Sequence, residues 1–165
     1  MTLNSNQFLQ SVEVGFCDRN TCCFNPIPVV VASTQSTAIG VGVPVSLATN
    51  TVNSVPKIVA STVSGAGTTA VSVFGFTFIH AHNNAFAANS RTDVLPVGSG
   101  AIIYLKAEGA ISAGALLSYT VSGGTVDTAA AGEVIIGQAL IGAAAAGDLI
   151  PVYLNQPFGA AVPSA

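Results

Sequence analysis

Long uncharged stretches that are broken by turn residues constrain the fold of this chain more than any other feature. Residues 20–56, 58–90 and 134–147 contain no Lys, Arg, Asp or Glu. A helix that spans a membrane needs about 20 consecutive apolar residues, and the third stretch is shorter than that. The first two are crowded with Ser, Thr, Asn, Gly and Pro, which favour turns, between β-branched residues, which favour strands. The pattern therefore indicates β structure and not membrane helices.

Glycines at positions 132, 137, 142 and 147 divide the third stretch and its surroundings. Five residues advance a helix by about 500°, so these glycines would point in different directions and could not form one packing seam. Each interior glycine would also weaken a helix by about 1 kcal/mol. As punctuation between short Val/Ile/Leu runs the glycines are typical of strands, and Gly137 is expected at a bulge or bend within a strand.

Short strands at regular spacing, without an amphipathic helical stretch, predict an all-β fold, a small β-barrel or sandwich. One short helix near His82–Ala88 is the exception that the sequence allows. The candidate strands are Pro28–Ala32, Val43–Leu47, Lys57–Val63, Ala70–Ile79, Ala101–Lys106, Ala115–Thr120, Val134–Ile141 and Leu149–Leu154.

The chain divides into three parts by composition. Residues 1–28 hold all three cysteines and the Pro-restricted segment FNPIP, and they are expected to form an N-terminal arm or edge element, with an ordinary first strand as the alternative. Residues 29–155 are expected to form the β domain, and residues 156–165 a C-terminal tail. The β domain contains an internal echo, which predicts two similar β units, about 40–106 and 112–155, that share one core.

Three pairs of segments carry this echo, in the same order in both units. GVPVSLATNTV (42–52) is similar to GALLSYTVSGGTV (114–126), VFGFTFI (73–79) to IIGQALI (135–141), and VGSGAIIYLK (97–106) to AAGDLIPVYLN (145–155). The first unit carries the longer loops.

The low charge of the chain indicates that other protein covers much of its surface. Charged residues make up 7% of the 165 residues, against about 25% in a typical soluble domain, and the net charge is −3. Such a surface has little electrostatic protection against association. The four basic residues are scattered, so no patch for nucleic acid is expected. The polar first residues lack the features of a signal peptide, so we expect synthesis in the cytoplasm.

Two histidines, His80 and His82, are weak candidates for metal ligands. On a strand both would point to one face, and Asp93 or Asn83 could add a third ligand. No third ligand has a diagnostic spacing, so polar loop residues or histidines at a symmetry axis are favoured over a metal site. Cysteines 17, 22 and 23 do not have the spacing of a zinc motif. They are expected to be small buried apolar side chains, with pairing between molecules as the alternative.

No catalytic motif is present: GxSxG, HExxH, P-loop and GxGxxG patterns are all absent. The Gly-rich segment 98–102 precedes a strand, so it is expected to be a turn and not a phosphate site. The carboxylates of Glu108, Asp127, Glu133 and Asp148 lie next to turn residues. Solvated loop charges are favoured over a glycosidase-like pair, and Asp148 is expected to order the turn before the last strand. We therefore expect neither enzymatic activity nor a cofactor.

The segment from residue 107 to 154 resembles the C-terminal part of phage capsid cement, or decoration, proteins. The similarity is carried by Gly114, Leu116, Val126, Ala131, Gly132, Ile136, Gly137, Ala139, Ala146, Gly147, Asp148, Leu149, Val152 and Leu154. The resemblance implies a small β-barrel-like domain, usually oligomeric and most often trimeric, that sits on the outer face of an assembled head and bridges capsomers. The segment FCDRNTCC departs from the usual pattern of these proteins.

The expected function is therefore that of a virion structural protein, which binds the major capsid protein and is assembled in the host cytoplasm. A charge-poor β protein suits permanent burial between neighbours, and an oligomer that touches several shell subunits gains affinity by multivalency. The alternative is a head- or tail-fibre module that recognises a host receptor or glycan. That alternative predicts exposed aromatic side chains at Phe86, Tyr104, Tyr119 and Phe158, although aromatics make up only 7% of the chain and Trp is absent.

Overall fold

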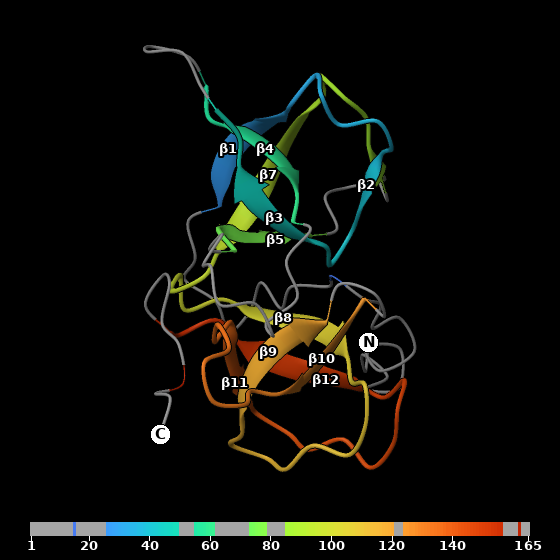
Figure 1. Ribbon diagram of the computed structural model, residues 1–165, viewed down its shortest axis with the longest axis vertical. Coiled ribbons are helices and arrows are strands. Elements are labelled where there is room, and N and C mark those ends of the chain that lie inside the picture. The colour runs from blue at the N-terminus through green and yellow to red at the C-terminus, as the bar shows by residue number, and fades with distance from the viewer. Residues whose placement is uncertain are drawn as a thin grey trace, which may run out of the picture.

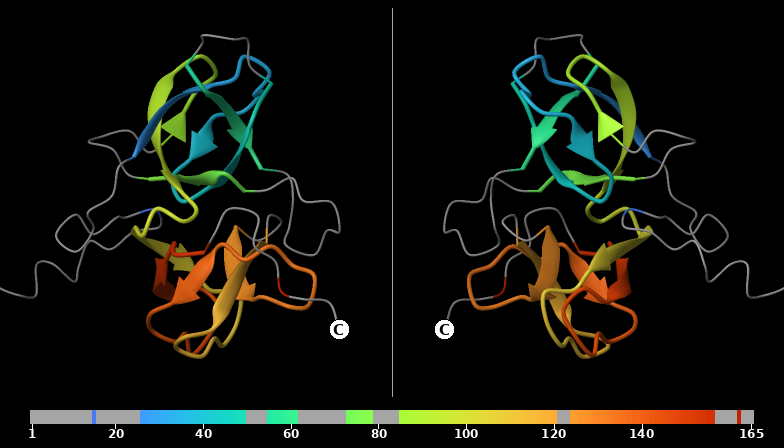
Figure 2. Two further views of the ribbon diagram at one scale, coloured as in Figure 1. Left: turned by 90° about the vertical axis from the view of Figure 1, so that its left-hand side faces the viewer. Right: turned by 90° about the vertical axis from the view of Figure 1, so that its right-hand side faces the viewer.

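The computed structural model describes residue 15 and residues 26–49, 55–61, 73–78, 85–120, 124–156 and 162. All regular secondary structure in this part of the chain is β-strand, which confirms the expected all-β fold. Two lobes are stacked along the long axis of the molecule (Figures 1 and 2). The strands are β1 (Ile27–Val31), β2 (Ile39–Gly40), β3 (Pro44–Leu47), β4 (Lys57–Ala60), β5 (Gly75–Thr77), β6 (Ala85–Phe86), β7 (Arg91–Pro96), β8 (Ile102–Lys106), β9 (Leu116–Thr120), β10 (Thr125–Thr128), β11 (Gly137–Ala139) and β12 (Leu149–Tyr153).

The first module is a closed barrel in the order β1-β4-β3-β5-β7. Strands β1 and β4 are parallel, and every other neighbouring pair is antiparallel. Closure removes the free sheet edges that would otherwise invite pairing with other chains. A two-stranded ribbon of β2 and β6 lies beside this barrel.

The second module is a five-stranded sheet in the order β10-β9-β11-β12-β8. Its two outer strands, β8 and β10, approach each other at a single parallel bridge between Ala107 and Val126. Here the N–H of Glu108 donates to the carbonyl oxygen of Val126 (2.9 Å). The sheet therefore curls almost into a second barrel, with the same parallel contact that closes the first.

The two modules have the same topology. If β1, β3, β4, β5 and β7 are matched in turn with β8, β9, β10, β11 and β12, the strand order and every strand direction agree. The hydrogen bonds between strands and turns also match, residue by residue. The matched N–H to C=O pairs are Gly42–Thr77 with Gly114–Ala139, Ala32–Ile58 with Glu108–Val126, Asn89–Val31 with Gly147–Ala107, and Phe74–Val45 with Ile136–Leu117. Random similarity between Gly-punctuated strands would not reproduce this network, so the chain is an internal duplication.

Backbone conformation repeats as well at the turn before the last strand of each module. Gly147 has a positive φ of 90°, and its counterpart Asn89 has a positive φ of 63°. Asn89 is the one non-Gly residue with positive φ among the described residues. Asparagine tolerates this left-handed region better than most residues do. The same turn geometry has therefore been kept with two different residues.

The boundary between the modules differs from the one that the echo suggested. The first two echo pairs match equivalent segments, because β3 corresponds to β9 and β5 to β11. The third pair is wrong: segment 97–106 contains β8, which opens the second module and pairs directly with β12. The true counterpart of β12 is β7, which the sequence did not predict because Arg91, Asp93 and Pro96 interrupt its apolar pattern.

Each of the eight predicted strands overlaps an observed one, and most of the observed strands are shorter than predicted. Strands β2, β6, β7 and β10 were not predicted, because they are very short or carry charged residues. The expected short helix near His82–Ala88 is wrong where the structure describes it. Residues 85–86 form strand β6, and residues 88–89 form a turn.

The described residues form two hydrophobic clusters, and the larger one is shared by both modules. The first barrel has an interior of its own, built around Val29, Val31, Val45, Ile58 and Val94. The second module encloses a larger cluster, to which the first module contributes side chains from the outer face of its β5–β7 sheet. These contributed residues are Val73, Phe76, Phe78, Leu95 and Val97. The first module therefore covers the near end of the second one.

Residues close to both termini contact the modules. The N–H of Gly15 donates to the carbonyl oxygen of Tyr104 on β8 (2.8 Å). A Cβ at position 15 would lie 2.6 Å from the backbone nitrogen of Gly42 in the first module. The expected arm thus touches both modules at this residue, and only glycine fits there. The first described strand begins at Ile27, and Val162 near the C-terminus exchanges backbone hydrogen bonds with Gly132 and Glu133.

Equivalent serines of the two modules give a matched test of a buried hydrogen bond. Ser46 and Ser118 are both buried, with 5% and 4% exposure. The Ser118 hydroxyl donates to Oε2 of Glu133 (2.7 Å), whereas the Ser46 hydroxyl has no hydrogen-bond partner among the described residues. Ser118→Ala is expected to lower the free energy of unfolding by about 2 kcal/mol, because it removes a bond to a carboxylate. Ser46→Ala should be neutral or stabilising, and equal losses in urea denaturation of the two variants would contradict this.

Candidate functional site

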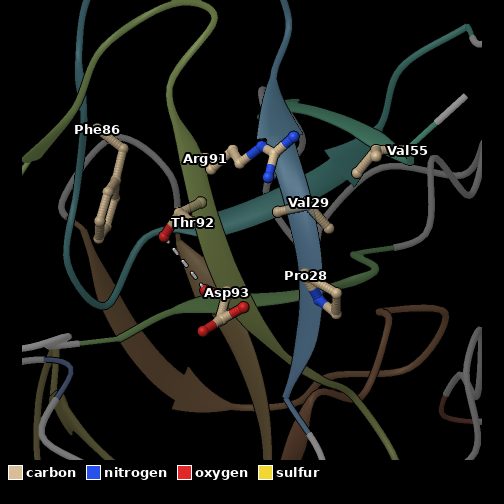
Figure 3. Close-up of a pocket in the computed structure, with 7 residues that line it drawn as sticks. All are labelled: Pro28, Val29, Val55, Phe86, Arg91, Thr92 and Asp93. Carbon is tan, nitrogen blue, oxygen red and sulfur yellow. Dashed lines mark hydrogen bonds between the residues drawn. The ribbon is translucent and has the colours of Figure 1, made fainter.

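A depression of about 320 Å³ lies on the first barrel beside β1 and β7 (Figure 3). It is lined by Pro28, Val29, Val55, Phe86, Arg91, Thr92 and Asp93. Most of these residues come from two paired strands. Pro28 on β1 pairs with Asp93 on β7, and Val29 on β1 pairs with Thr92 on β7. The depression therefore combines apolar surface with one guanidinium and one carboxylate.

The hydroxyl that lines this depression is bonded to the backbone: the Thr92 hydroxyl donates to the backbone carbonyl of Asp93 (3.4 Å). An activated hydroxyl needs a histidine, carboxylate or amine within hydrogen-bond reach of its proton. Among the described residues that line the depression, no histidine or cysteine is found.

Three of the four carboxylates that the sequence singled out, Glu108, Glu133 and Asp148, lie outside the strands, and Asp127 lies within β10. The Asp148 carboxylate accepts from the N–H groups of Ala144 (2.8 Å) and Ala145 (2.9 Å). It therefore orders the turn before the last strand, as expected, although its donors lie upstream of it. Glu133 accepts from the N–H of Ala130 (2.8 Å) besides the hydroxyl of Ser118.

The other two carboxylates make weaker or local contacts. Glu108 accepts from the hydroxyl of Thr125 (3.4 Å), and Asp127 accepts from the N–H of Thr128 (2.7 Å). The segment 98–102 forms a turn that leads into β8, with positive φ at Gly98 and Gly100, as expected.

The predicted metal and thiol residues lie outside the described residues. This applies to His80, His82, Asn83 and the three cysteines at 17, 22 and 23, whereas Asp93 is part of β7. Within the described ranges no three His, Cys, Asp or Glu side chains come together as a metal site. In the same ranges no helix is long and apolar enough to cross a membrane.

Two of the four aromatic residues that the fibre alternative would use for glycan stacking are buried. Phe86 and Tyr119 are buried, with 3% and 5% exposure, so the expectation that they are exposed on loops is wrong. Burial raises the pKa of Tyr119 to about 12, because the charged phenolate would lose its hydration. Tyr104 on β8 is half-buried, and Phe158 lies outside the described residues.

Exposed apolar side chains form the most distinctive surface of the described residues. Five large hydrophobic residues are exposed: Leu47, Val55, Leu116, Leu140 and Ile141. Three of them, Leu116, Leu140 and Ile141, belong to the second module and lie on or next to its central strands, β9 and β11. The other two lie in the first module, Leu47 at the end of β3 and Val55 just before β4.

Two exposed residues of the second module, Leu116 and Leu140, belong to one face of its sheet, and Ile141 follows Leu140 in the bend after β11. Leu116 pairs with Gln138, and Gln138 pairs with Tyr153, so these three side chains form a row across β9, β11 and β12. Leu140 lies two residues beyond Gln138 and points to the same side. With Ile141, these residues form what we call the β11 face. These five residues are uncharged, but the face continues into Ser118, two residues beyond Leu116 on the same side of β9, and the Ser118 hydroxyl is bonded to the carboxylate of Glu133.

Comparison of the chain with protein-family models, curated proteins and solved structures found no match. The candidate site therefore depends on the geometry of the two modules.

Sequence reasoning did not identify the β11 face. The run VIIGQALI is apolar at both odd and even positions, which is the pattern of a strand buried on both sides. The similarity between IIGQALI and VFGFTFI is the signal that could have found it. Two similar strands in one chain need not have the same neighbours, so one copy can be exposed where the other is covered.

Proposed function

We propose that this protein is a capsid decoration, or cement, subunit of a phage, which binds the outer face of an assembled head and bridges capsomers. The observation that carries the proposal is the group of exposed apolar side chains on the β11 face, Leu116, Leu140 and Ile141, on a chain with very few charges. An exposed apolar surface on a rigid β scaffold is typical of a protein that works in permanent contact with others. The surface is suited to association and lacks the groups needed for chemistry.

The residues that carry the resemblance to cement proteins support this proposal through their structural roles. Gly114, Gly132 and Gly147 have positive φ and form turns of the second module. Gly137 lies against the backbone of β12, where a Cβ would be 2.5 Å from the carbonyl oxygen of Tyr153. Asp148 holds the turn before β12. The motif is therefore the signature of one folded module, and the first module repeats that architecture with a different sequence.

Bridging of a shell follows from multivalency. A subunit or oligomer that contacts several capsomers makes each later contact intramolecular, which raises the overall affinity by about 10²–10⁴. Weak individual contacts are then sufficient, and no deep pocket or charged patch is required. A fibre module that binds a glycan would instead need exposed aromatic rings. Two of the candidate rings, Phe86 and Tyr119, are buried.

Sedimentation with capsids tests the proposed function. Purified protein is mixed with undecorated heads and centrifuged, and we expect it to sediment with the heads at a saturable ratio. Heads that already carry their full complement serve as the control and should take up no more protein. Protein that stays in the supernatant with undecorated heads, but binds host cells, would overturn the proposal in favour of the fibre module.

A further inference from the structure

The contact between the two modules has two halves, one supplied by each module. The first half is the outer face of the β3-β5-β7 sheet, where Pro44, Phe76 and Leu95 form a row of cross-strand neighbours. The second half is the end of the second module at Tyr119. The rings of Phe76 and Tyr119 meet edge to face, with centroids 5.8 Å apart and planes at 65°. All of these side chains are buried.

The first half of this contact is repeated in the second module, without a partner module on it. By the matched hydrogen bonds, the row Pro44–Phe76–Leu95 corresponds to Leu116–Gln138–Tyr153. In the same way, Phe78 corresponds to Leu140. Phe78 is 2% exposed beneath the second module, whereas Leu140 is 45% exposed. The β11 face is thus the second copy of a surface whose first copy is an established interface.

The second half is repeated in the first module and is also open. Tyr119 pairs with Val126 on β10, and at the same register Leu47 pairs with Ile58 on β4. Tyr119 is 5% exposed, but Leu47 is 50% exposed. Val55, 44% exposed, lies on the other arm of the same β3–β4 hairpin. We call Leu47 and Val55 the β3–β4 tip.

We infer that the β11 face of one copy of this chain docks onto the β3–β4 tip of a second copy, in the manner in which the first module docks onto the second. The occupant is a second copy because the same chain carries both unfilled halves of an interface that it already forms internally. Every large exposed hydrophobic residue among the described residues belongs to one of these two halves. This contact would build a homo-oligomer, as expected for a cement protein. The two copies can associate whether or not a capsid is present.

The contact is heterologous, since different surfaces of the two copies meet. A heterologous contact in an open pair leaves one free half at each end, so further copies can add until the assembly closes on itself or continues as an open filament. A closed assembly would bury all copies of both halves and would end the growth. The inference therefore predicts a homo-oligomer that is built by head-to-tail contacts.

Substitutions on the two halves test this in solution without heads. Leu140→Asp on the β11 face and Leu47→Asp on the β3–β4 tip are each expected to weaken association by roughly 100-fold, because each places a carboxylate in an apolar contact. Ile141→Asp is a second variant of the β11 face, in case Leu140→Asp affects folding. Thr34→Asp, at an exposed turn in neither half, is the matched control. Analytical ultracentrifugation measures the mass, and circular dichroism verifies that each variant is folded.

Mixing the variants distinguishes the head-to-tail contact from any symmetric one. Leu140→Asp keeps an intact β3–β4 tip, and Leu47→Asp keeps an intact β11 face, so the mixture should form one-to-one dimers although neither variant associates alone. A natural protein that is monomeric at all concentrations would overturn the inference. Unchanged assembly of folded Leu47→Asp would also overturn it. Failure to bind heads, with head-to-tail association intact, would reject the proposed function and leave this inference standing.

Discussion

Replacement of Phe76 by alanine is expected to lower the free energy of unfolding by about 4 kcal/mol. Phe76 is fully buried at the junction between the modules, and it is the largest side chain that the first module contributes to the shared core together with Phe78. Its removal leaves a cavity between two rigid sheets, which cannot collapse to fill it. It also removes the edge-to-face contact with Tyr119, worth about 1 kcal/mol beyond the buried area. Urea denaturation followed by far-ultraviolet circular dichroism measures the loss.

The control for this prediction is Phe76→Leu, which keeps most of the buried volume and should cost markedly less than the alanine variant. Because the modules share one core, the natural protein should unfold in a single cooperative transition. Two separate transitions in the natural protein, or a loss below 1 kcal/mol in Phe76→Ala, would show that the modules are independent.

The sequence was sufficient to predict the fold class and most strands, because these depend on local pattern. Runs of β-branched residues between Gly, Pro and polar turn residues are typical of strands in any arrangement. Strand β7 was missed for a local reason too: Arg91 and Asp93 occupy its outward positions and weaken the apolar signal. Without β7, the echo matched β12 to the segment of its own cross-strand neighbour, β8.

The candidate site could not be predicted, because exposure is a property of the assembled modules. Phe78 and Leu140 are both large apolar residues at equivalent positions, and nothing in their local sequence indicates that only Phe78 is covered. The same holds for Tyr119 and Leu47. Burial of an apolar side chain is favourable at each of these positions. Phe78 and Tyr119 are buried and Leu140 and Leu47 are exposed because a single chain contains two modules and can make this contact only once.

The charged residues and the exposed apolar residues of this chain are distributed differently. Charges are sparse along the whole chain, but the exposed apolar side chains gather at two places that correspond to the two sides of one interface. A duplicated module that makes its contact in a head-to-tail manner always leaves one copy of each side unfilled. The duplication therefore accounts for both the position and the number of the exposed surfaces.

Replacement of Gly137 by alanine is expected to lower the free energy of unfolding by about 3 kcal/mol. A Cβ at this position would lie 2.5 Å from the carbonyl oxygen of Tyr153 and 3.0 Å from Cγ1 of Val152. Both neighbours belong to β12, whose backbone is fixed by pairing on each side with β11 and β8. The strands would have to move apart, which disrupts the interior of the second module. The sequence expectation of a bulge or bend at Gly137 is thus replaced by a close approach of two backbones, and thermal or urea denaturation measures its cost.

Two further glycines make this prediction specific. Gly109 has no atom within 4 Å of a Cβ added to it, so Gly109→Ala should change the stability by no more than about 1 kcal/mol in either direction. Gly75 is the counterpart of Gly137 in the first module, and a Cβ there would collide with the backbone of Leu95 on β7. Gly75→Ala should therefore be destabilising to a similar degree. If Gly137→Ala and Gly109→Ala were equally stable, β11 and β12 would have to be spaced more widely than the matched topology requires, and the equivalence of the two modules at this strand would be lost.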